Sequence, residues 1–474
     1  MRLKLGEVAE ILGTICGTLD RVAQGYSIDS RTVAAGDLFF AIRGPRFDGH
    51  QFVTPALGRG AVGAVVESAF AAESPSDEKG SLLAVPSPTE SLQRLAQSVR
   101  RQWGKRLVAI TGSTGKSTTK EMIAAILSER FSVLKSQGNL NNHYGLPLTL
   151  LALEPQHDVA VTELGMSAAG EIAFLTRLAQ PQVGVVTNVA PAHLQFFDSV
   201  DAIARAKREL IENLIPDGTA VLNNDDERVR KFSEGFRGRT VSFGFSRGST
   251  FQVSEFRALT DGGSAFRVRA PSFDGEFQLQ LPGRHNVQNA AAATAASSVL
   301  GATSEDCQKG LAKFRPLALR SEIVTLPGGI ILINDSYNSN PLAMGKMLET
   351  LAQWPSAGRR IVVAGEMLEL GPTSAELHRA VGRKCPASGV DWLIAVQGEA
   401  RFFLVGAQEA GMASERLHCF SSPGEAADFC RTLLQPGDVV LVKGSRGVHL
   451  EKVIADLQSP LNDKQAAGPA VPRN

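Results

Sequence analysis

A glycine-rich segment after an apolar run constrains the fold of this chain more than any other feature. Residues 106–110 read RLVAI, residues 111–118 read TGSTGKST, and a helical pattern begins at Lys116. This order of strand, turn and helix gives a phosphate-binding loop physical meaning, because backbone amides and the helix N-terminus then point at phosphate oxygens. Lys116 would hold the β- and γ-phosphates of a nucleotide, and Ser117 would offer its hydroxyl to Mg²⁺.

The loop departs from the common pattern G-x-x-x-x-G-K-[ST], which wants glycine where this chain has Ile110. We interpret it as a shortened variant that binds ATP. A glycine turn beside a solvated lysine is the plainer alternative, and the strand and helix on its two sides weigh against it. The predicted nucleotide-binding residues of the loop are Gly112, Ser113, Thr114, Gly115, Lys116, Ser117 and Thr118.

Length and texture predict an α/β protein of three domains, since 474 residues exceed a typical domain about threefold. Residues 1–104 mix a short helical pattern with strand-like runs, and the polar segment 71–81 is expected to be a surface loop. The next region alternates apolar strands with helical stretches, which implies a parallel sheet, and short alternating strands at about 240–282 predict an antiparallel meander attached to it.

A second α/β series follows, with the apolar runs IILINDS, RRIVVAGEM, DWLIAVQG and DVVLVKGS, which lead into Gly, Asp or Ser, as expected of a Rossmann-like C-terminal domain. The tail has no apolar period and is expected to be disordered. We place the first domain at 1–104, the ATP-binding domain at 105–318, the C-terminal domain at 319–458 and the tail at 459–474.

Composition limits the classes of partner. The chain carries 49 basic and 48 acidic residues, which argues against a broad surface for nucleic acid or anionic membrane. Its 5 cysteines are widely spaced without a C-x-x-C pair, so neither a disulfide framework nor a zinc knuckle is predicted. We found no export signal and no apolar stretch long enough to span a membrane. A cytoplasmic monomer that binds no nucleic acid and does not insert into membranes is expected.

Polar side chains follow two predicted strands of the middle domain. Glu163 ends DVAVTE, and His193 follows VGVVTNV. Because parallel strands end at the same edge of a sheet, both would lie near the phosphate loop and could share a metal site. A helix-capping or surface glutamate and a turn histidine are the plainer alternatives.

The other end of the nucleotide has candidates as well. Asn286 and Asn289 are three residues apart at the start of a predicted helix and could meet an adenine edge; helix capping would explain Asn286 but not Asn289. Asp335 ends IILIND, where a carboxylate can accept from both ribose hydroxyls. ATP would then lie between two domains, and domain closure would complete the site.

Several motifs occur together in a fixed order: TGSTGKS, GNLNNHYGLPLTLL, TELG, NVAPAHL with AKREL, LPGRHNVQNAAAA, INDSYNSNP, GEMLELG and VLVKGSRG. In this order the chain resembles the Mur ligases from about residue 25 to 455, and SIDSRTVAAGDLFFAIRGPRFDGHQF looks like their UDP-binding domain. Folylpolyglutamate synthases share the loop variant. The D-N-P-R signature of the diaminopimelate-adding relative is absent, and NDSYNSNP replaces the D-Y-A-H-type motif of its neighbours.

The resemblance implies an ATP- and Mg²⁺-dependent amide ligase that joins D-alanyl-D-alanine to UDP-N-acetylmuramoyl-tripeptide through an acyl phosphate. A diaminopimelate- or lysine-adding Mur ligase and a folylpolyglutamate synthase relative are the alternatives. A protein that uses ATP only as a conformational switch is a third, and the joint presence of the residues below argues against it.

Residue roles also follow from the resemblance. Lys116, Glu163, His193 and Lys207 would be catalytic, with Ser117, Glu163, His193 and a carbamylated Lys207 binding Mg²⁺. The plainer reading of Lys207 is a solvated helix face. Asn139 or Asn142 would contact the terminal phosphate, Asn289 the base, and Arg320 and Asp335 the rest of the nucleotide. The remaining assignments are the UDP-pocket residues Ser30, Arg31, Arg43, Asp48 and His50, and the C-terminal pocket residues Lys443, Ser445 and Arg446, of which Arg446 would meet the dipeptide carboxylate.

Overall fold

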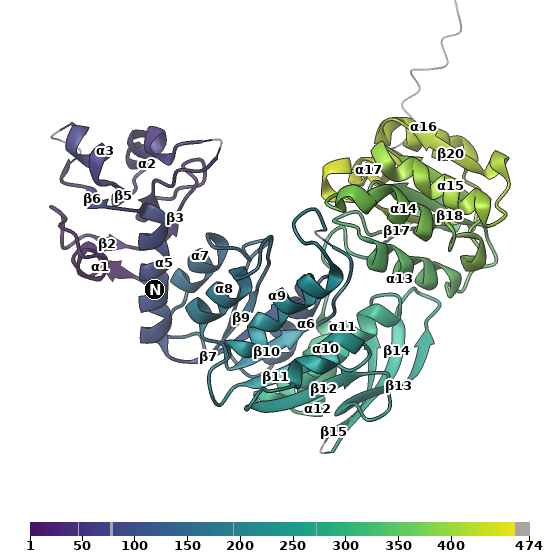
Figure 1. The fold of residues 1–474 in the computed structure, drawn as a ribbon, viewed down its shortest axis with the longest axis horizontal. Coiled ribbons are helices and arrows are strands. Elements are labelled where there is room, and N and C mark those ends of the chain that lie inside the picture. The colour runs from purple at the N-terminus through teal and green to yellow at the C-terminus, as the bar shows by residue number, and fades with distance from the viewer. Residues whose placement is uncertain (46, 76–78, 193, 272, 460–474) are drawn as a thin grey trace, which may run out of the picture.

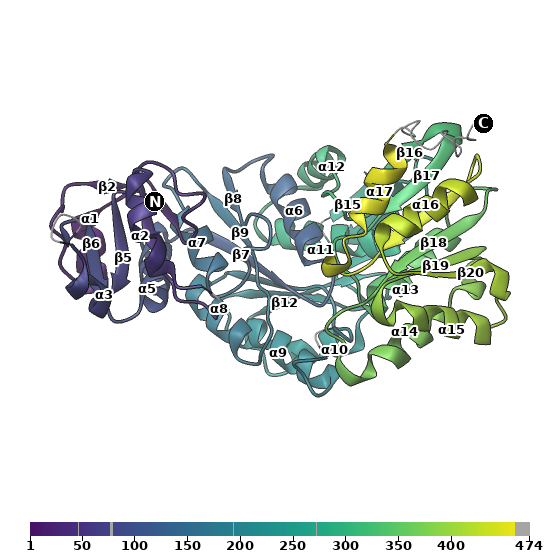
Figure 2. The same cartoon turned by 90° about the horizontal axis from the view of Figure 1, so that it is seen from above.

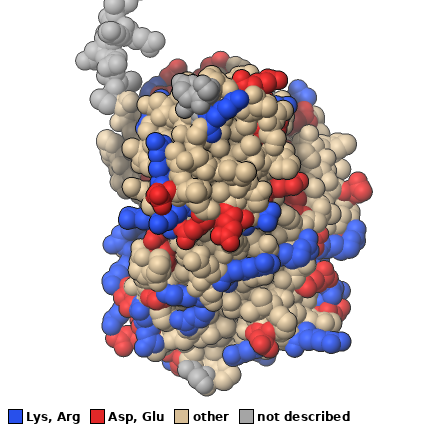
Figure 3. All heavy atoms as spheres, turned by 90° about the vertical axis from the view of Figure 1, so that its left-hand side faces the viewer, with Lys and Arg blue, Asp and Glu red and all other residues tan. Residues whose placement is uncertain are grey.

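The computed structural model describes residues 1–45, 47–75, 79–192, 194–271 and 273–459. Three α/β units follow one another across the molecule, and the N-terminal and C-terminal units lie at opposite ends of the central one (Figures 1 and 2). No described helix is both long and apolar enough to cross a membrane. Basic and acidic side chains are interspersed on the end of the molecule that the N-terminal unit forms (Figure 3). The predicted disordered tail lies outside the described residues apart from Ser459.

The N-terminal unit is built on a four-stranded parallel sheet in the order β3-β4-β5-β6, beside a small β1-β2 pair. The predicted surface loop at 71–81 is wrong at its start, because residues 71–73 end helix α3, and residues 76–78 lie outside the described residues. Its elements are β1 Leu3–Lys4, α1 Leu5–Leu12, β2 Val22–Ala23, β3 Gly25–Ser27, β4 Asp37–Phe40, η1 Gly49–Phe52, α2 Val53–Gly58, β5 Gly63–Glu67, α3 Ser68–Glu73, β6 Leu82–Val85 and α5 Pro88–Trp103.

Helix α5 joins this unit to the central one. Ser87 caps its start by accepting from the Glu90 amide, and Gly104 ends it with a φ of 66°, which glycine adopts without steric cost. The buried Arg100 donates from Nε to the Ala179 carbonyl at 2.7 Å. One apolar cluster runs through α5 from the first unit into the second, so the two units share a core.

The central unit holds a nine-stranded sheet in the order β15-β14-β13-β12-β11-β10-β7-β9-β8. The seven strands from β7 to β13 pair in parallel. Strand β14 pairs antiparallel with both β13 and β15, which confirms the predicted meander. The strands are β7 Arg106–Thr111, β8 Val133–Lys135, β9 Val159–Glu163, β10 Val183–Val186, β11 Thr219–Asn223, β12 Arg239–Gly244, β13 Phe251–Ala258, β14 Ser264–Ala270 and β15 Phe273–Leu279.

Helices cover both faces of this sheet. Strand side chains alternate between faces, so Leu107 and Ala109 of β7 join the cluster under α7, α8 and α9, while Val108 and Ile110 join the one under α6, α11 and α12. The helices are α6 Lys116–Leu127, α7 Gly145–Leu151, α8 Glu171–Ala179, α9 Val200–Glu212, α10 Glu227–Arg230, η2 Lys231–Ser233, α11 Arg284–Val299 and α12 Ser304–Lys313.

The C-terminal unit holds a six-stranded sheet in the order β16-β17-β21-β18-β19-β20, parallel except for β16. The four predicted apolar runs form β17, β18, β19 and β21, whereas the edge strands β16 and β20 were not predicted. The elements are β16 Glu322–Leu326, η3 Pro327–Gly329, β17 Ile330–Asn334, α13 Pro341–Ala352, β18 Arg360–Gly365, η4 Gly371–Thr373, α14 Ser374–Gly382, η5 Pro386–Ser388, β19 Trp392–Val396, η6 Gly398–Ala400, α15 Arg401–Glu409, η7 Ser414–Arg416, β20 Leu417–Phe420, α16 Pro423–Leu433, β21 Val439–Lys443, η8 Arg446–Val448 and α17 Glu451–Gln458.

Candidate functional site

The glycine-rich loop lies between β7 and α6, and residues that follow β10 form hydrogen bonds with its backbone. The Thr114 amide donates to Asn188 Oδ1 at 3.0 Å, and Thr187 Oγ1 donates to the Thr114 carbonyl at 2.6 Å. Gly112 has a φ of 148° and Gly115 a φ of 79°. A Cβ at Gly115 would lie 2.3 Å from Asn289 Oδ1. Glycine is therefore required there both for conformation and for space.

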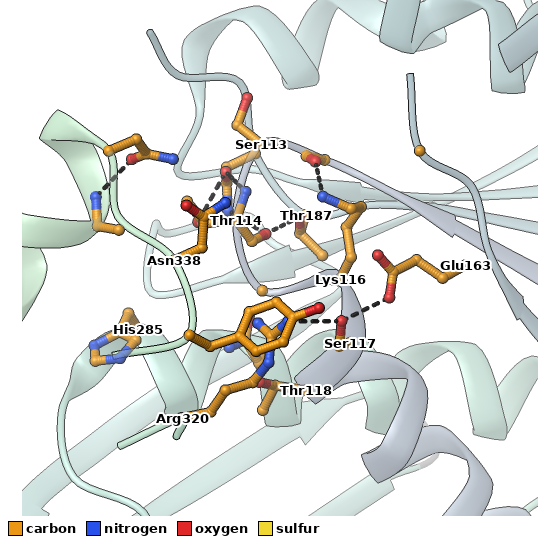
Figure 4. A pocket seen from close by; sticks show the side chains of 18 of the residues that line it. Ser113, Thr114, Lys116, Ser117, Thr118, Glu163, Thr187, His285, Arg320 and Asn338 are labelled. Atoms are coloured by element: carbon orange, nitrogen blue, oxygen red, sulfur yellow. Dashed lines mark hydrogen bonds between the residues drawn. The ribbon is translucent and has the colours of Figure 1, made fainter. Parts of the chain in front are cut away.

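Three polar groups converge beside this loop (Figure 4). Ser117 Oγ donates to Glu163 Oε2 at 2.6 Å, and Arg320 Nη2 donates to Ser117 Oγ at 3.2 Å. Asn141 Nδ2 donates to Glu163 Oε1 at 2.9 Å. Burial alone would raise the pKa of the Glu163 carboxyl, but Lys116, the two hydrogen bonds and Arg320 together lower it. Glu163 is therefore a buried carboxylate that stays ionised.

Two lysines reach the same region from different helices. Lys116 Nζ donates to the Gly112 carbonyl at 3.0 Å. Lys207 of α9 is only 3% exposed, and no hydrogen bond or ion pair to its amine occurs among the described residues. Burial and the neighbouring Lys116 charge lower the pKa of Lys207 well below its usual value. The surroundings of Lys207 therefore favour its neutral amine over the charged form.

These residues line one cavity of about 540 Å³ between the central and C-terminal units. The central unit contributes the loop, Glu163, Lys207 and the start of α11, and the C-terminal unit contributes the segment after β17 and the last residue of β21, among others. The C-terminal side chains that line it include Arg320, Asp335, Tyr337, Asn338, Lys346, Glu369 and Lys443.

The C-terminal wall is organised by a buried ion pair. Lys443 Nζ donates to the Asp335 carboxylate and, at 2.9 Å, to the Asn338 carbonyl. The Ser321 amide donates to Asp335 Oδ1 at 2.9 Å. Burial alone would raise the pKa of Asp335, but Lys443 together with its hydrogen bond lowers it. Arg320 stacks over the Tyr337 ring at 4.0 Å, so its guanidinium spans from the C-terminal wall to Ser117.

The start of α11 forms the floor of the cavity. Both predicted asparagines, Asn286 and Asn289, are buried there and line the cavity. Gly283, and not Asn286, is the N-cap of this helix, so capping does not explain either amide. His285 also lines the cavity; burial and nearby Lys346 lower its pKa to about 3, so its ring is neutral.

The asparagine-rich turn brings Asn139, Asn141 and Asn142 to the cavity, and the phosphate contact predicted for Asn139 or Asn142 stays a prediction. Asn142 Oδ1 accepts from the Tyr144 and Gly145 amides and holds the start of α7. Asn139 is exposed at the cavity wall, and the residue that contacts Glu163 is Asn141. Asn141 was not predicted, because the sequence does not show which of several neighbouring asparagines the backbone of a turn directs toward Glu163. His193 lies outside the described residues.

The predicted UDP-pocket residues lie in the N-terminal unit, away from this cavity. His50 Nε2 accepts from the Glu67 amide at 3.0 Å, so its Nδ1 carries the proton and donates to Asp48 at 2.6 Å. Both nitrogens are thus used within the protein. Arg43 pairs with Asp48 and Glu67 while 60% of its side chain stays exposed.

Arg31 pairs with the neighbouring Asp29 and remains 85% exposed, and the adjacent Ser30 is half-buried. The two arginines are therefore the reachable members of the predicted UDP set. The three residues predicted for the C-terminal pocket do not all lie at the cavity. Lys443 faces the cavity, whereas buried Ser445 accepts from the Leu368 amide at 2.9 Å and Arg446 pairs with Glu451 on the surface.

The donor set is compatible with Mg²⁺. Glu163 and Ser117 present a carboxylate and a hydroxyl 2.6 Å apart, and Mg²⁺ prefers oxygen ligands while keeping waters and substrate phosphates. No cluster of three or more His, Cys, Asp or Glu side chains suited to a metal occurs within the described part of the chain.

A phosphate loop that faces a second α/β unit across a polar cavity defines a P-loop enzyme that acts on a nucleotide. Residues 110–297 match the Mur ligase middle domain, residues 319–446 the Mur ligase, glutamate ligase domain, and residues 23–100 the Mur ligase family, catalytic domain. The UDP-N-acetylmuramoyl-tripeptide--D-alanyl-D-alanine ligase of Escherichia coli (strain K12) is 35% identical over 96% of this chain and 98% of its own length.

Solved structures agree with this similarity. A crystal structure of MurF from Acinetobacter baumannii aligns with a TM-score of 0.87 at 32% identity, covering 97% of this chain and 99% of that one. The crystal structure of MurF ligase from Thermotoga maritima in complex with ADP aligns with a TM-score of 0.81 at 29% identity, covering 92% and 97%. The chain therefore belongs to the Mur ligase family of ATP-dependent ligases.

Proposed function

We propose that this ligase joins D-alanyl-D-alanine to UDP-N-acetylmuramoyl-tripeptide and releases ADP and phosphate, in the synthesis of peptidoglycan precursors. The observation that carries the proposal is the cavity in which Lys116, Glu163 and Lys207 of one unit face Asp335 and Lys443 of another. The nearly full-length similarity to ligases named for this reaction supports it. Because ATP and UDP-linked precursors are cytoplasmic metabolites, we propose that the enzyme acts in the cytoplasm, and we propose that it acts as a monomer.

ATP would lie across the cavity with its phosphates on the loop. Lys116 would exchange its contact with the Gly112 carbonyl for the β- and γ-phosphates. Asn289 would read the base, and Asp335 would accept from the ribose hydroxyls beside Arg320. The nucleotide would then be bound by both the central unit, proposed to begin near residue 105, and the C-terminal unit, proposed to begin near residue 319. Relative motion of these two units would open and close the site.

The chemistry follows from the charges around the loop. A carboxylate oxygen of the tripeptide attacks the γ-phosphorus, the bond to the ADP oxygen breaks, and an acyl phosphate forms. The neutral amine of the dipeptide then attacks the acyl carbon, phosphate leaves, and the amine gives up a proton. Lys116 and Arg320 are the fixed cations that would hold the phosphate oxygens as charge moves between them.

Mg²⁺ would supply the positive charge that balances the phosphates. Ser117 and Glu163 would hold it, together with His193 and a carbamate on Lys207. Lys207 is buried and has no anionic partner among the described residues, so an unmodified cation there would be costly. Its neutral amine adds to carbon dioxide and loses one proton, which turns a side chain that repels a metal ion into a two-oxygen anion.

The carbamate has a direct test. Activity should fall in carbon-dioxide-depleted buffer and return with bicarbonate. Lys207→Arg should not restore the activity lost in Lys207→Ala, because a guanidinium keeps the charge but cannot become that anion. Electron density for an unmodified Lys207 in a catalytically active, bicarbonate-supplied crystal would overturn this part of the proposal.

The two substrates would enter from opposite units. Arg31 and Arg43, beside Ser30, are exposed cations suited to the UDP diphosphate, with Asp48 and His50 shaping the turn that presents Arg43. Arg446 of the C-terminal unit, next to Ser445, would meet the dipeptide carboxylate once the units close.

The deciding experiment supplies the purified protein with ATP, Mg²⁺, UDP-N-acetylmuramoyl-tripeptide and a panel of amines, and measures released phosphate together with product mass. D-alanyl-D-alanine should be the preferred amine. Turnover only with diaminopimelate, lysine or glutamate would assign a different reaction within the family. ATP binding without phosphate release on any amine would indicate a nucleotide switch.

A further inference from the structure

Two side-chain amides on α11 form a chain whose direction is fixed by a backbone carbonyl. Asn286 Nδ2 donates to the Pro282 carbonyl at 2.9 Å. Asn289 Nδ2 donates in turn to Asn286 Oδ1 at 3.3 Å. A carbonyl can only accept, so the Asn286 group that faces Pro282 has to be the NH₂ group. Its oxygen therefore faces Asn289, and Asn289 has to turn its own NH₂ group toward Asn286.

This arrangement determines which atom Asn289 offers to a ligand. Its Oδ1 lies beside Gly115 of the phosphate loop, at the cavity, and among the described residues the side-chain hydrogen bond of Asn289 is the one from its Nδ2 to Asn286. If the Asn289 amide turned over, its oxygen would face Asn286 Oδ1 and no hydrogen bond would join them. Asn286 cannot follow by turning over, because its oxygen would then face the Pro282 carbonyl.

We propose that Asn286 is a positioning residue that makes the site select 6-aminopurine over 6-oxopurine nucleotides. It does so by holding Asn289 with its oxygen toward the base. The proposal rests on the base-reading role of Asn289 that forms part of the proposed function. Asn286 itself acts through Asn289 and need not touch the nucleotide.

The selection follows from donor and acceptor chemistry. The 6-amino group of adenine donates, and the fixed Asn289 oxygen can accept from it. The 6-oxo group of hypoxanthine only accepts, so it would place one oxygen against another. An Asn289 free to turn over would offer its NH₂ group to the 6-oxo group instead, and the discrimination would be lost. A well-placed amide contact to a base changes selectivity by about 10- to 100-fold.

The experiment compares kcat/KM for ATP with kcat/KM for inosine triphosphate, which carries a 6-oxo group and no 2-amino group. Asn286→Ala and the larger Asn286→Leu should both lower the ATP preference by about 10-fold or more. Asn286→Asp should keep the preference, because a carboxylate still accepts from Asn289 Nδ2. A purely structural role predicts the reverse for Asn286→Asp, which loses the Pro282 bond and buries a charge.

Ser297→Ala is the matched control, since this buried hydroxyl on the same helix has no hydrogen-bond partner among the described residues. It should leave the ATP preference unchanged, and thermal unfolding of each variant separates misfolding from altered selectivity. An unchanged preference in both apolar Asn286 variants overturns the proposal. If Asn289→Ala lowers the preference while they do not, only the positioning role of Asn286 fails. If Asn289→Ala also keeps it, the base-reading role fails as well.

Discussion

Breaking the buried ion pair between Asp335 and Lys443 gives the sharpest test of the cavity's C-terminal wall. The Lys443 side chain is 2% exposed and that of Asp335 is 16% exposed. Removing one partner of a buried pair costs about 3–5 kcal/mol, because the other charge stays desolvated. In Asp335→Asn, Lys443 keeps its 2.9 Å bond to the Asn338 carbonyl. We therefore expect a loss of about 3 kcal/mol, the lower end of that range.

The measurement is a double-mutant cycle of Asp335→Asn, Lys443→Met and both together, followed by urea unfolding of the C-terminal unit. Because Lys443→Met removes the stranded charge, the double variant should be more stable than Asp335→Asn, with a coupling of about 2 kcal/mol or more. Additive losses would refute the reasoning. A double variant as stable as the wild type would show that the pair as a whole adds nothing to the stability of the fold.

The same pair predicts a pH dependence. Burial acts to raise the pKa of Asp335, but Lys443 lowers it below the ordinary value in the folded protein. The pair's contribution is therefore fully present above the unfolded pKa of about 3.9 and is lost as pH falls through the lower, folded pKa. The stability gap between the wild type and Asp335→Asn should be constant from about pH 5 to 8 and shrink below about pH 4.

Three further variants test the loop and the core. Lys116→Ala removes the fixed cation at the phosphates, so phosphate release should fall by about 10²-fold or more with an unchanged unfolding transition; turnover near the wild-type rate would contradict the assignment. Gly115→Ala puts a Cβ 2.3 Å from Asn289 Oδ1 at a φ of 79°, so KM for ATP should rise. Gly411→Ala, at a φ of 94° in open space, is the control for backbone strain alone and should leave KM unchanged. Arg100→Met removes the hydrogen-bond donors of the Ala179 and Gln180 carbonyls, so the free energy of unfolding should fall by about 1–3 kcal/mol. An unchanged unfolding transition would mean that water replaces these donors.

Local sequence patterns predicted the elements that carry the chemistry. Strand, glycine turn and helix at 106–127 were readable because each local preference points to the same structure, and the alternating texture at 240–282 identified the meander. The edge strands β16 and β20 were not singled out, since short edge strands carry weak patterns. The start of the 71–81 loop was misread because alanines at the end of α3 sit beside polar residues.

Neighbouring side chains of the same type were not resolved by sequence. Asn139, Asn141 and Asn142 are chemically identical, and only the turn's backbone path places Asn141 on Glu163 and Asn142 on the start of α7. His50 likewise has the composition of a ligand-binding residue, but the Glu67 amide and Asp48 occupy both of its nitrogens.

The sequence by itself determined the phosphate loop, the order of the α/β units and the family, because these depend on contiguous residues and their periodicity. Tertiary structure decided which distant side chains meet: Arg320 lies against Ser117, and Lys443 against Asp335. It also buried Lys207 near Lys116, without an ion-pair partner in the part of the chain that the structure describes. It also decided the orientation of the amides on α11, which depends on a carbonyl one turn earlier. The burial of a side chain, its hydrogen-bond or ion-pair partner and its orientation all depend on how the chain packs. These three properties set the charge of each group in the site and the ligand atoms it can bind.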